Sequence, residues 1–131
     1  MAGAVSRWLG AIDGLPEIVQ RLQRVQIENA PAIEVLRRYD TEETLFYLDP
    51  PYVHGSRGDT NAYGNEMSDW DHIQLGETLK NIKGRAVISG YRTKLYDELF
   101  KGWKRIDAPE KLCNSSKGYR QESLWINFPP N

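Results

Sequence analysis

The sequence predicts an α/β fold in which parallel strands are followed by a C-terminal antiparallel pair. Residues 44–48 and 86–89 are short, almost continuous apolar runs, which are typical of strands buried inside a sheet. Segments with apolar residues at helical spacing alternate with these runs. The chain has 131 residues, of which 40% are hydrophobic and 11% aromatic, enough to build one small packed domain. This composition excludes a wholly disordered chain.

The first half of the chain is predicted to form two helices and two strands. Asp13 is a suitable helix N-cap, and Pro16 suits a first helical turn. One helical stripe of apolar residues follows: Leu15, Ile18, Val19 and Leu22. Residues 25–28 are interpreted as a short strand and residues 29–38 as a short helix. Residues 44–48 then form a strand that we expect to be buried on both faces.

A long loop and a capped helix are predicted next. Residues 53–67 contain three glycines and two asparagines and show no apolar period, which favours a loop. Ser68 and Asp71 resemble a capping pair at the start of a helix. The apolar face of that helix is formed by Ile73, Leu75, Leu79 and Ile82.

The last part of the chain alternates again between strand and helix. Residues 86–89 form a strand, and Gly90 and Tyr91 separate it from another helix. That helix has four apolar positions: Leu95, Tyr96, Leu99 and Phe100. Two final strands, at residues 103–107 and 123–128, are joined by a polar connection.

Several classes of protein are excluded by what the sequence lacks. It contains no run of about 18 apolar residues, as a transmembrane helix requires. Residues 1–10 lack the basic start and long apolar stretch of a signal peptide. Cys113 is the single cysteine, and no Cys/His spacing indicates a metal site. We therefore expect a soluble protein of the reducing cytoplasm that needs no metal.

Charge is distributed unevenly along the chain although the net charge is −1. Residues 1–79 carry six basic and 13 acidic side chains, whereas residues 80–120 carry 11 basic and four acidic ones. A basic face of this kind can bind a polyanion such as DNA. Solvated helix faces and hairpin edges explain the same pattern equally well, so the charge permits nucleic acid without requiring it.

The most informative motif is Leu48-Asp49-Pro50-Pro51-Tyr52, directly after a predicted buried strand. In open α/β sheets, ligands bind outside the carboxyl ends of the strands. Asp49 offers carboxylate acceptors, and the prolines have carbonyl groups but no N–H. Tyr52 adds a flat aromatic ring. Rigid acceptors beside an aromatic plate suit a planar amine that donates hydrogen bonds while it is stacked.

This segment resembles the DPPY catalytic motif of the DNA adenine methyltransferases, in particular the phage- and prophage-type members. The likeness extends over nearly the whole chain. The segments that carry it are residues 21–22, 25–29, 44–52, 71–72, 87–91, 95–97, 102–103 and 122–127. The resemblance implies a Rossmann-like sheet and transfer of a methyl group from S-adenosylmethionine to the exocyclic amino nitrogen of adenine in double-stranded DNA.

The resemblance also implies residue roles. Asp49 and the Pro50 carbonyl accept hydrogen bonds from the adenine amino group, Pro51 completes the rigid catalytic motif, and Tyr52 stacks on a base flipped out of the duplex. Asp49 also touches the cofactor. Asn29 is a candidate for cofactor binding, although a helix cap explains it equally well. Tyr63 is a candidate for substrate binding, or lies in a loop without such a role.

Structural explanations compete with these roles. Asp49 alone is also compatible with capping a turn, and Pro50 and Pro51 with a polyproline-type ligand for a partner. His54 and His72 have no obvious ligand partners and are interpreted as surface or capping residues. The two tryptophans of the C-terminal region, Trp103 and Trp125, are interpreted as core residues rather than base-stacking residues.

No Gly-x-Gly occurs among the 11 glycines, whereas the family uses a glycine-rich loop to bind the methionine part of its cofactor. We therefore expect residues 1–131 to be one domain that corresponds to the C-terminal catalytic part of such an enzyme, lacks the glycine-loop strand and is inactive or weakly active by itself. Residues 1–24 would be the tail of the target-recognition region. Its expected partners are DNA and either the missing N-terminal half or a second copy. The alternatives are a non-catalytic nucleic-acid-binding or regulatory remnant and a methyltransferase for a non-DNA amine.

Overall fold

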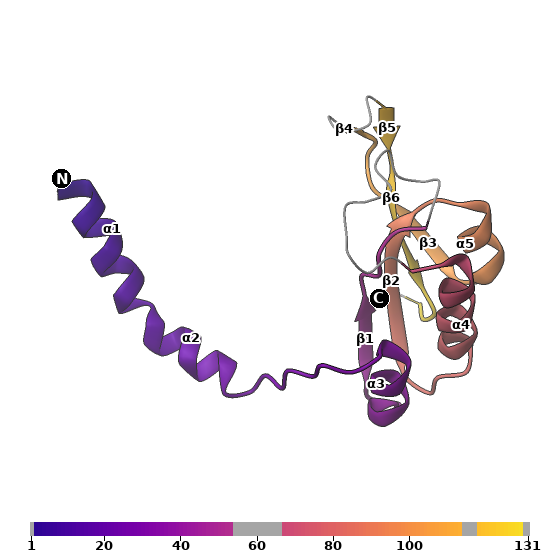
Figure 1. Cartoon of the computed structure of the whole chain (residues 1–131), viewed down its shortest axis with the longest axis horizontal. Coiled ribbons are helices and arrows are strands. Elements are labelled where there is room, and N and C mark those ends of the chain that lie inside the picture. The colour runs from indigo at the N-terminus through magenta and orange to yellow at the C-terminus, as the bar shows by residue number, and fades with distance from the viewer. Residues whose placement is uncertain (1, 54–66, 114–117, 130–131) are drawn as a thin grey trace. The chain divides into compact units, whose positions relative to one another are not determined.

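The computed structural model describes residues 2–53, 67–113 and 118–129, and the chain divides into two compact units. The first unit spans Met1–Ala30 and the second Pro31–Asn131. The positions of the two units relative to one another are not determined, so each is described by itself (Figure 1). Whether residues 1–131 form a single domain stays a prediction.

The first unit contains two helices, α1 (Ala2–Asp13) and α2 (Leu15–Leu22). Helix α2 confirms the expected stripe, with Pro16 in its first turn, but the residue at its N-cap is Gly14 because Asp13 belongs to α1. Helix α1 was not expected from the sequence. The strand predicted at residues 25–28 is wrong, since no described strand pairs with these residues and an isolated strand leaves its backbone groups unpaired.

The second unit contains three helices and six strands in its described residues. They are α3 (Ala32–Tyr39), β1 (Leu45–Leu48), α4 (Asp69–Lys80), β2 (Arg85–Tyr91), α5 (Lys94–Leu99), β3 (Lys104–Asp107), β4 (Lys111–Cys113), β5 (Gly118–Arg120) and β6 (Glu122–Ile126). All the helices and strands predicted from residue 29 onward are present. The connection between the last two predicted strands is not irregular throughout, because β4 and β5 form a separate antiparallel pair within it.

Four strands form one sheet in the order β1-β2-β6-β3. Strand β1 pairs with β2 in parallel, whereas β6 pairs antiparallel with both β2 and β3. The expected mixture of parallel strands and a C-terminal antiparallel pair is thereby confirmed. Because β1 and β2 run in the same direction, their carboxyl ends meet at one edge of the sheet.

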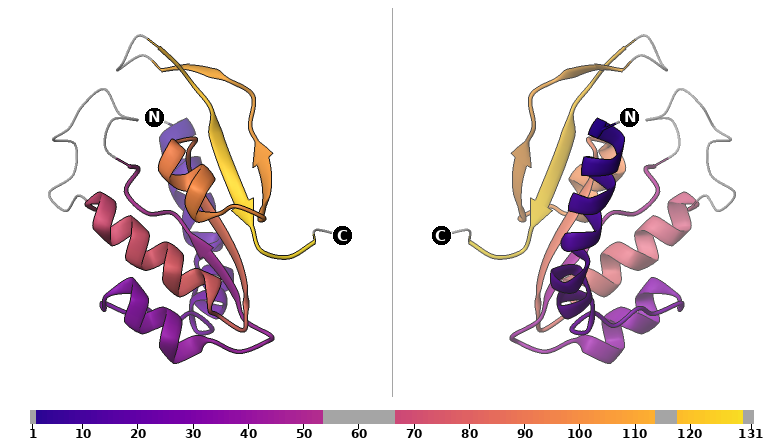
Figure 2. Two further views of the ribbon diagram at one scale, coloured as in Figure 1. Left: turned by 90° about the vertical axis from the view of Figure 1, so that its right-hand side faces the viewer. Right: turned by 90° about the vertical axis from the view of Figure 1, so that its left-hand side faces the viewer.

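The core lies between one face of this sheet and the three helices α3, α4 and α5, which lie on the same side of it in both views of Figure 2. Alternate strand residues point into this layer, as the two-residue period of a strand requires. The sheet contributes Phe46, Leu48, Ala86, Ile88 and Trp125 to the core. Helix α4 begins with the expected capping box, in which Ser68 and Asp71 satisfy each other's backbone N–H groups.

The opposite face of β1 carries large apolar side chains in solvent. Leu45 is 60% exposed and Tyr47 66% exposed, so the prediction of burial on both faces is wrong for this strand. The cause is that the described helices of the second unit cover one face only, and β1 is an edge strand in the described sheet. An alternating pattern with one solvated face is therefore observed.

At the amino ends of β1 and β2, the segments that lead into the two strands are bound to each other. The Asp40 carboxylate, just after α3, accepts hydrogen bonds from the backbone N–H groups of Lys83 and Gly84 at 2.9 Å. These bonds lower the pKa of Asp40 below its ordinary value. At Gly84 a Cβ atom would stand 2.8 Å from the carbonyl oxygen of Thr44, so the two segments approach as closely as glycine allows.

None of the described helices has the length and hydropathy needed to cross a membrane.

We predict that the exposed edge of β1 pairs with a second copy of the chain. The sequence Leu45–Leu48 carries no charge, whereas the other edge strand, β3, is protected by Lys104, Arg105 and Asp107. Tyr47→Lys is expected to shift a dimer toward monomer in sedimentation velocity at low micromolar concentration. Ile106→Lys on β3 is the matched control and leaves the distribution unchanged. A strictly monomeric wild-type chain whose Tyr47 amide exchanges freely with solvent would contradict the prediction.

Candidate active site

The Asp49–Tyr52 segment lies where the sequence predicts, at the carboxyl end of β1. Register fixes what lies beside it. Leu48 pairs with Ile88, so Ser89 of β2 comes level with Asp49, and Tyr91 follows two residues later on the same face. The carboxyl ends of two parallel strands therefore supply one set of neighbouring side chains.

The Asp49 carboxylate is bound by a serine from the neighbouring strand. The Ser89 hydroxyl lies 2.8 Å from Asp49 Oδ1, to which it donates, and 3.1 Å from the carbonyl oxygen of Leu48. Ser89 is 8% exposed, whereas Asp49 is exposed. A buried side chain on a strand that is paired on both sides thus holds a carboxylate that reaches solvent.

The ring of Tyr52 packs edge-on against Tyr91, with 4.4 Å between the ring centroids and an interplanar angle of 63°. Burial and, to a smaller extent, the negative charges of Glu122 and Asp49 together raise the pKa of Tyr52 to about 12. Tyr52 is therefore a neutral phenol at physiological pH.

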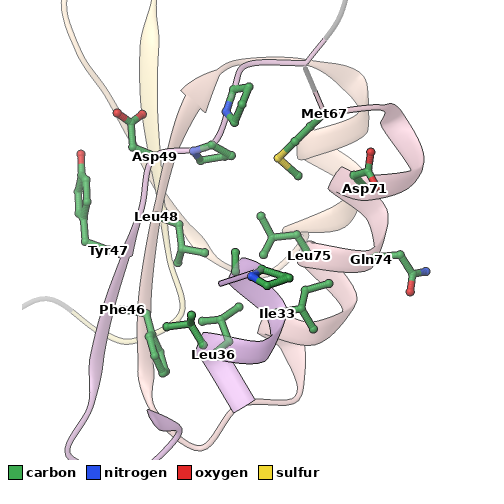
Figure 3. A pocket seen from close by; sticks show the side chains of 15 residues that line it. Ile33, Leu36, Phe46, Tyr47, Leu48, Asp49, Met67, Asp71, Gln74 and Leu75 are labelled. Atoms are coloured by element: carbon green, nitrogen blue, oxygen red, sulfur yellow. The ribbon is translucent and has the colours of Figure 1, made fainter. Parts of the chain in front are cut away.

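A pocket of about 640 Å³ lies beside β1, and Tyr47 and Asp49 are among the residues that line it. Its lining is mostly apolar and includes Ile33, Leu36, Phe46, Leu48, Met67 and Leu75. Figure 3 shows Tyr47 and Asp49 on one side of the strand and the side chains of Leu48 and Phe46 on the side of the pocket. Pro50 and Pro51 line the pocket with Asp49 at the end of β1, so the motif lies at the border between the apolar pocket and a polar face.

Comparison with known families matches residues 6–114 to the D12 class N6 adenine-specific DNA methyltransferases. This match spans most of the chain. The chain belongs to the D12 class of N6 adenine-specific DNA methyltransferases. The resemblance seen in the sequence is thereby confirmed. A search of curated proteins found no match to the chain.

In this D12 chain, the other candidate residues are not all brought to the motif. Asn29 belongs to the first unit, so its role in cofactor binding stays a prediction. Tyr63 and His54 lie outside the described residues. Trp125 is buried in the core and Trp103 packs against it, as expected from the sequence.

The interpretation of His72 as a surface or capping residue is wrong. His72 is buried, and its Nδ1 atom lies 3.0 Å from the Tyr96 hydroxyl. The physical reason is its position on α4: the buried residues of this helix are His72, Leu75, Gly76 and Leu79, which follow helical spacing. The imidazole extends the apolar stripe into the core and lies outside the D12 motif.

Two residues beside the motif were not assigned to the site from the sequence, Ser89 and Tyr91. Both lie in a segment that carries the family resemblance, and both are on the face of β2 that Asp49 shares. The missing information was the register of the parallel pair, which decides that Ser89 comes level with Asp49. With that register, the alternation of strand residues places Tyr91 on the same face.

A tyrosine titration tests the packing of the D12 motif. A raised pKa means that folding favours the neutral phenol of Tyr52. The resulting stabilisation is present below pH of about 10 and is lost as the pH rises toward about 12. We predict that Tyr52→Phe removes one late-titrating tyrosine from the ultraviolet absorbance titration of the folded chain. Tyr96, whose pKa is also raised by burial, remains in the late component of this variant.

Proposed function

We propose that this chain carries the base-modifying site of an adenine-specific DNA methyltransferase. Its site transfers a methyl group from S-adenosylmethionine to the exocyclic amino nitrogen of an adenine flipped out of double-stranded DNA. The observation that carries the proposal is the placement of the Asp49 carboxylate and the Tyr52 ring at one sheet edge, held by Ser89 and Tyr91 of the neighbouring strand. Membership in the D12 class supports the substrate.

The chemistry requires acceptors because the adenine amino group is a poor nucleophile. Its lone pair is delocalised into the ring, and hydrogen bonds from both N–H groups to fixed acceptors favour a pyramidal nitrogen. We assign these acceptors to the Asp49 carboxylate and the Pro50 carbonyl. As the nitrogen gains positive charge during attack on the methyl carbon, a preorganised carboxylate stabilises it. Pro51 keeps the turn rigid because its φ angle is fixed.

We assign base stacking to Tyr52. The target adenine must leave the duplex before a methyl donor can reach it, and extrusion costs a few kcal/mol. Stacking on an aromatic side chain returns about 1–3 kcal/mol per base. The ring of Tyr52 is oriented by Tyr91 and is uncharged at physiological pH, so it offers a flat apolar surface beside the acceptors.

The described residues fit the cofactor in part. S-adenosylmethionine supplies an electrophilic methyl group when it is bound. Asp49 is suited to contact its cationic side, and the apolar pocket bordered by Pro50 has the size of a ligand site. The polar group of Asp71 at the pocket rim already serves the α4 cap, accepting from Ser68 N and Oγ. No Gly-x-Gly is available in the sequence for the methionine carboxylate.

That missing glycine motif favours a second candidate function, a non-catalytic nucleic-acid-binding or regulatory remnant of the same family. Calorimetry with S-adenosylmethionine separates the two. Binding heat supports the methyltransferase, and its absence together with retained DNA binding supports the remnant.

The basic side chains are divided between the two ends of the sheet. Lys83 and Arg85 stand at the start of β2, about 20 Å from Tyr91 at roughly 3.3 Å per residue. Lys94 follows the carboxyl end of β2, which is the end of the sheet where β1 leads into the motif. Duplex DNA that presents a base to Asp49 would pass the carboxyl end of β2. We therefore assign phosphate contact to Lys94 rather than to Lys83.

We predict that Asp49→Ala abolishes methyl transfer and leaves DNA affinity nearly unchanged. The carboxylate acts on the amino group, whereas duplex affinity arises mostly from phosphate contacts. Transfer of labelled methyl groups to adenine-containing duplexes and a DNA-binding titration measure the two effects. Asp69→Ala, an exposed aspartate in the first turn of α4, is the control. Turnover of Asp49→Ala within about tenfold of wild type, which is small compared with typical losses of a catalytic group, would exclude the assigned role.

We also predict that Lys94→Ala weakens DNA binding similarly for all sequences and reduces the slope of log affinity against log salt by about 1. Lys83→Ala, an equal loss of charge at the far end of β2, leaves the slope unchanged. Slopes equal to that of wild type for both variants would assign both lysines to solvent.

A further inference from the structure

We propose that Ser89 is a positioning residue for methyl transfer, which sets the orientation of the Asp49 carboxylate toward the adenine amino group. The inference rests on the proposed function, because it assigns a supporting residue to the same site. It arises from the hydrogen bond between two neighbouring parallel strands.

The two partners differ in how firmly the fold holds them. Ser89 belongs to β2, which is paired with β1 on one side and β6 on the other. Asp49 lies one residue beyond the last paired residue of β1 and is followed by the two prolines of the motif. A hydrogen bond from Ser89 therefore connects a side chain at the start of a turn to the centre of the sheet.

The bond occupies one oxygen of the carboxylate and leaves the other available. Ser89 donates to Oδ1 at 2.8 Å, a normal length for a hydroxyl bound to a carboxylate. Oδ2 can then accept from an amino N–H. Because the serine is neutral, it orients the carboxylate without cancelling its charge, whereas a lysine or arginine at this position would form an ion pair with it.

A purely structural explanation of Ser89 is that its hydroxyl only satisfies the Leu48 carbonyl, 3.1 Å away. The chain offers a matched control for this explanation. Ser123 is 1% exposed, lies on β6 and pairs with Gly90, directly beside Ser89 in sequence. Its hydroxyl donates to Asp107 Oδ1 at 2.7 Å, which is the same kind of bond without a connection to the motif.

The first experiment needs no turnover. In the full chain labelled with ¹³C-aspartate, the Asp49 carboxyl resonance is assigned with Asp49→Asn and followed at neutral pH. Ser89→Ala is expected to move this resonance, Ser89→Thr to return it toward the wild-type position, and Ser123→Ala to leave it unchanged. Thermal unfolding of both alanine variants verifies that they are folded. An unchanged resonance in folded Ser89→Ala would overturn the inference.

The second experiment measures methyl transfer from S-adenosylmethionine to duplex DNA. We expect Ser89→Ala to lower kcat by about tenfold to a hundredfold, the range that misplacement of a reacting group produces, with KM for DNA within about twofold. Ser89→Thr restores kcat, and Ser123→Ala keeps both constants. Equal kcat values for Ser89→Ala and Ser123→Ala would overturn the inference. If wild type transfers no methyl group, the proposed function fails for this chain, and the resonance still decides whether Ser89 holds Asp49.

Discussion

The parallel pairing of β1 with β2 is the constraint on which the site depends. It brings the carboxyl ends of two strands to one edge, so that residues about 40 positions apart in sequence meet there. The opposite ends are fixed by Asp40, which binds the backbone of the turn before β2, and by Gly84, where the two segments nearly touch. The contacts at the start of the strands thus fix the register, and the register places Ser89 beside Asp49 at their carboxyl ends.

The same register separates the chemistry from the core. Leu48 points toward the helices, so Asp49 points to the other face, because successive strand residues alternate. A slip of one residue would turn the carboxylate toward the apolar pocket, where it has few polar partners and a large desolvation cost. The burial of Phe46 and Leu48 therefore enforces the orientation of the catalytic motif.

How much the sequence could predict differs between local and long-range features. The spacing of apolar residues and the Ser68 cap were sufficient to predict nearly all elements of the second unit. The motif after residues 44–48 was sufficient to indicate the family. Residues 25–28 were misassigned because strand formation depends on a partner that local sequence does not reveal. For His72 the residue type favours a surface position, whereas its spacing with Leu75 and Leu79 places it on the buried stripe of α4. Ser89 required the register of a parallel pair, and register is a tertiary property.

The electrostatic character of the site follows from these neighbours and bears on the proposed reaction. Burial is the largest cause of the raised pKa of Tyr52, and the negative charges of Asp49 and of Glu122, which pairs with Tyr91, raise it in the same direction. The nearest arginine of the adjoining loop, Arg92, is engaged by Asp97, and Arg105 is shared between Asp97 and Asp107. A negative field disfavours a phenolate and favours a developing cation for the same reason. The two carboxylates thus disfavour a phenolate at Tyr52 and favour positive charge at the position proposed for the methylated nitrogen, whereas burial disfavours both charges.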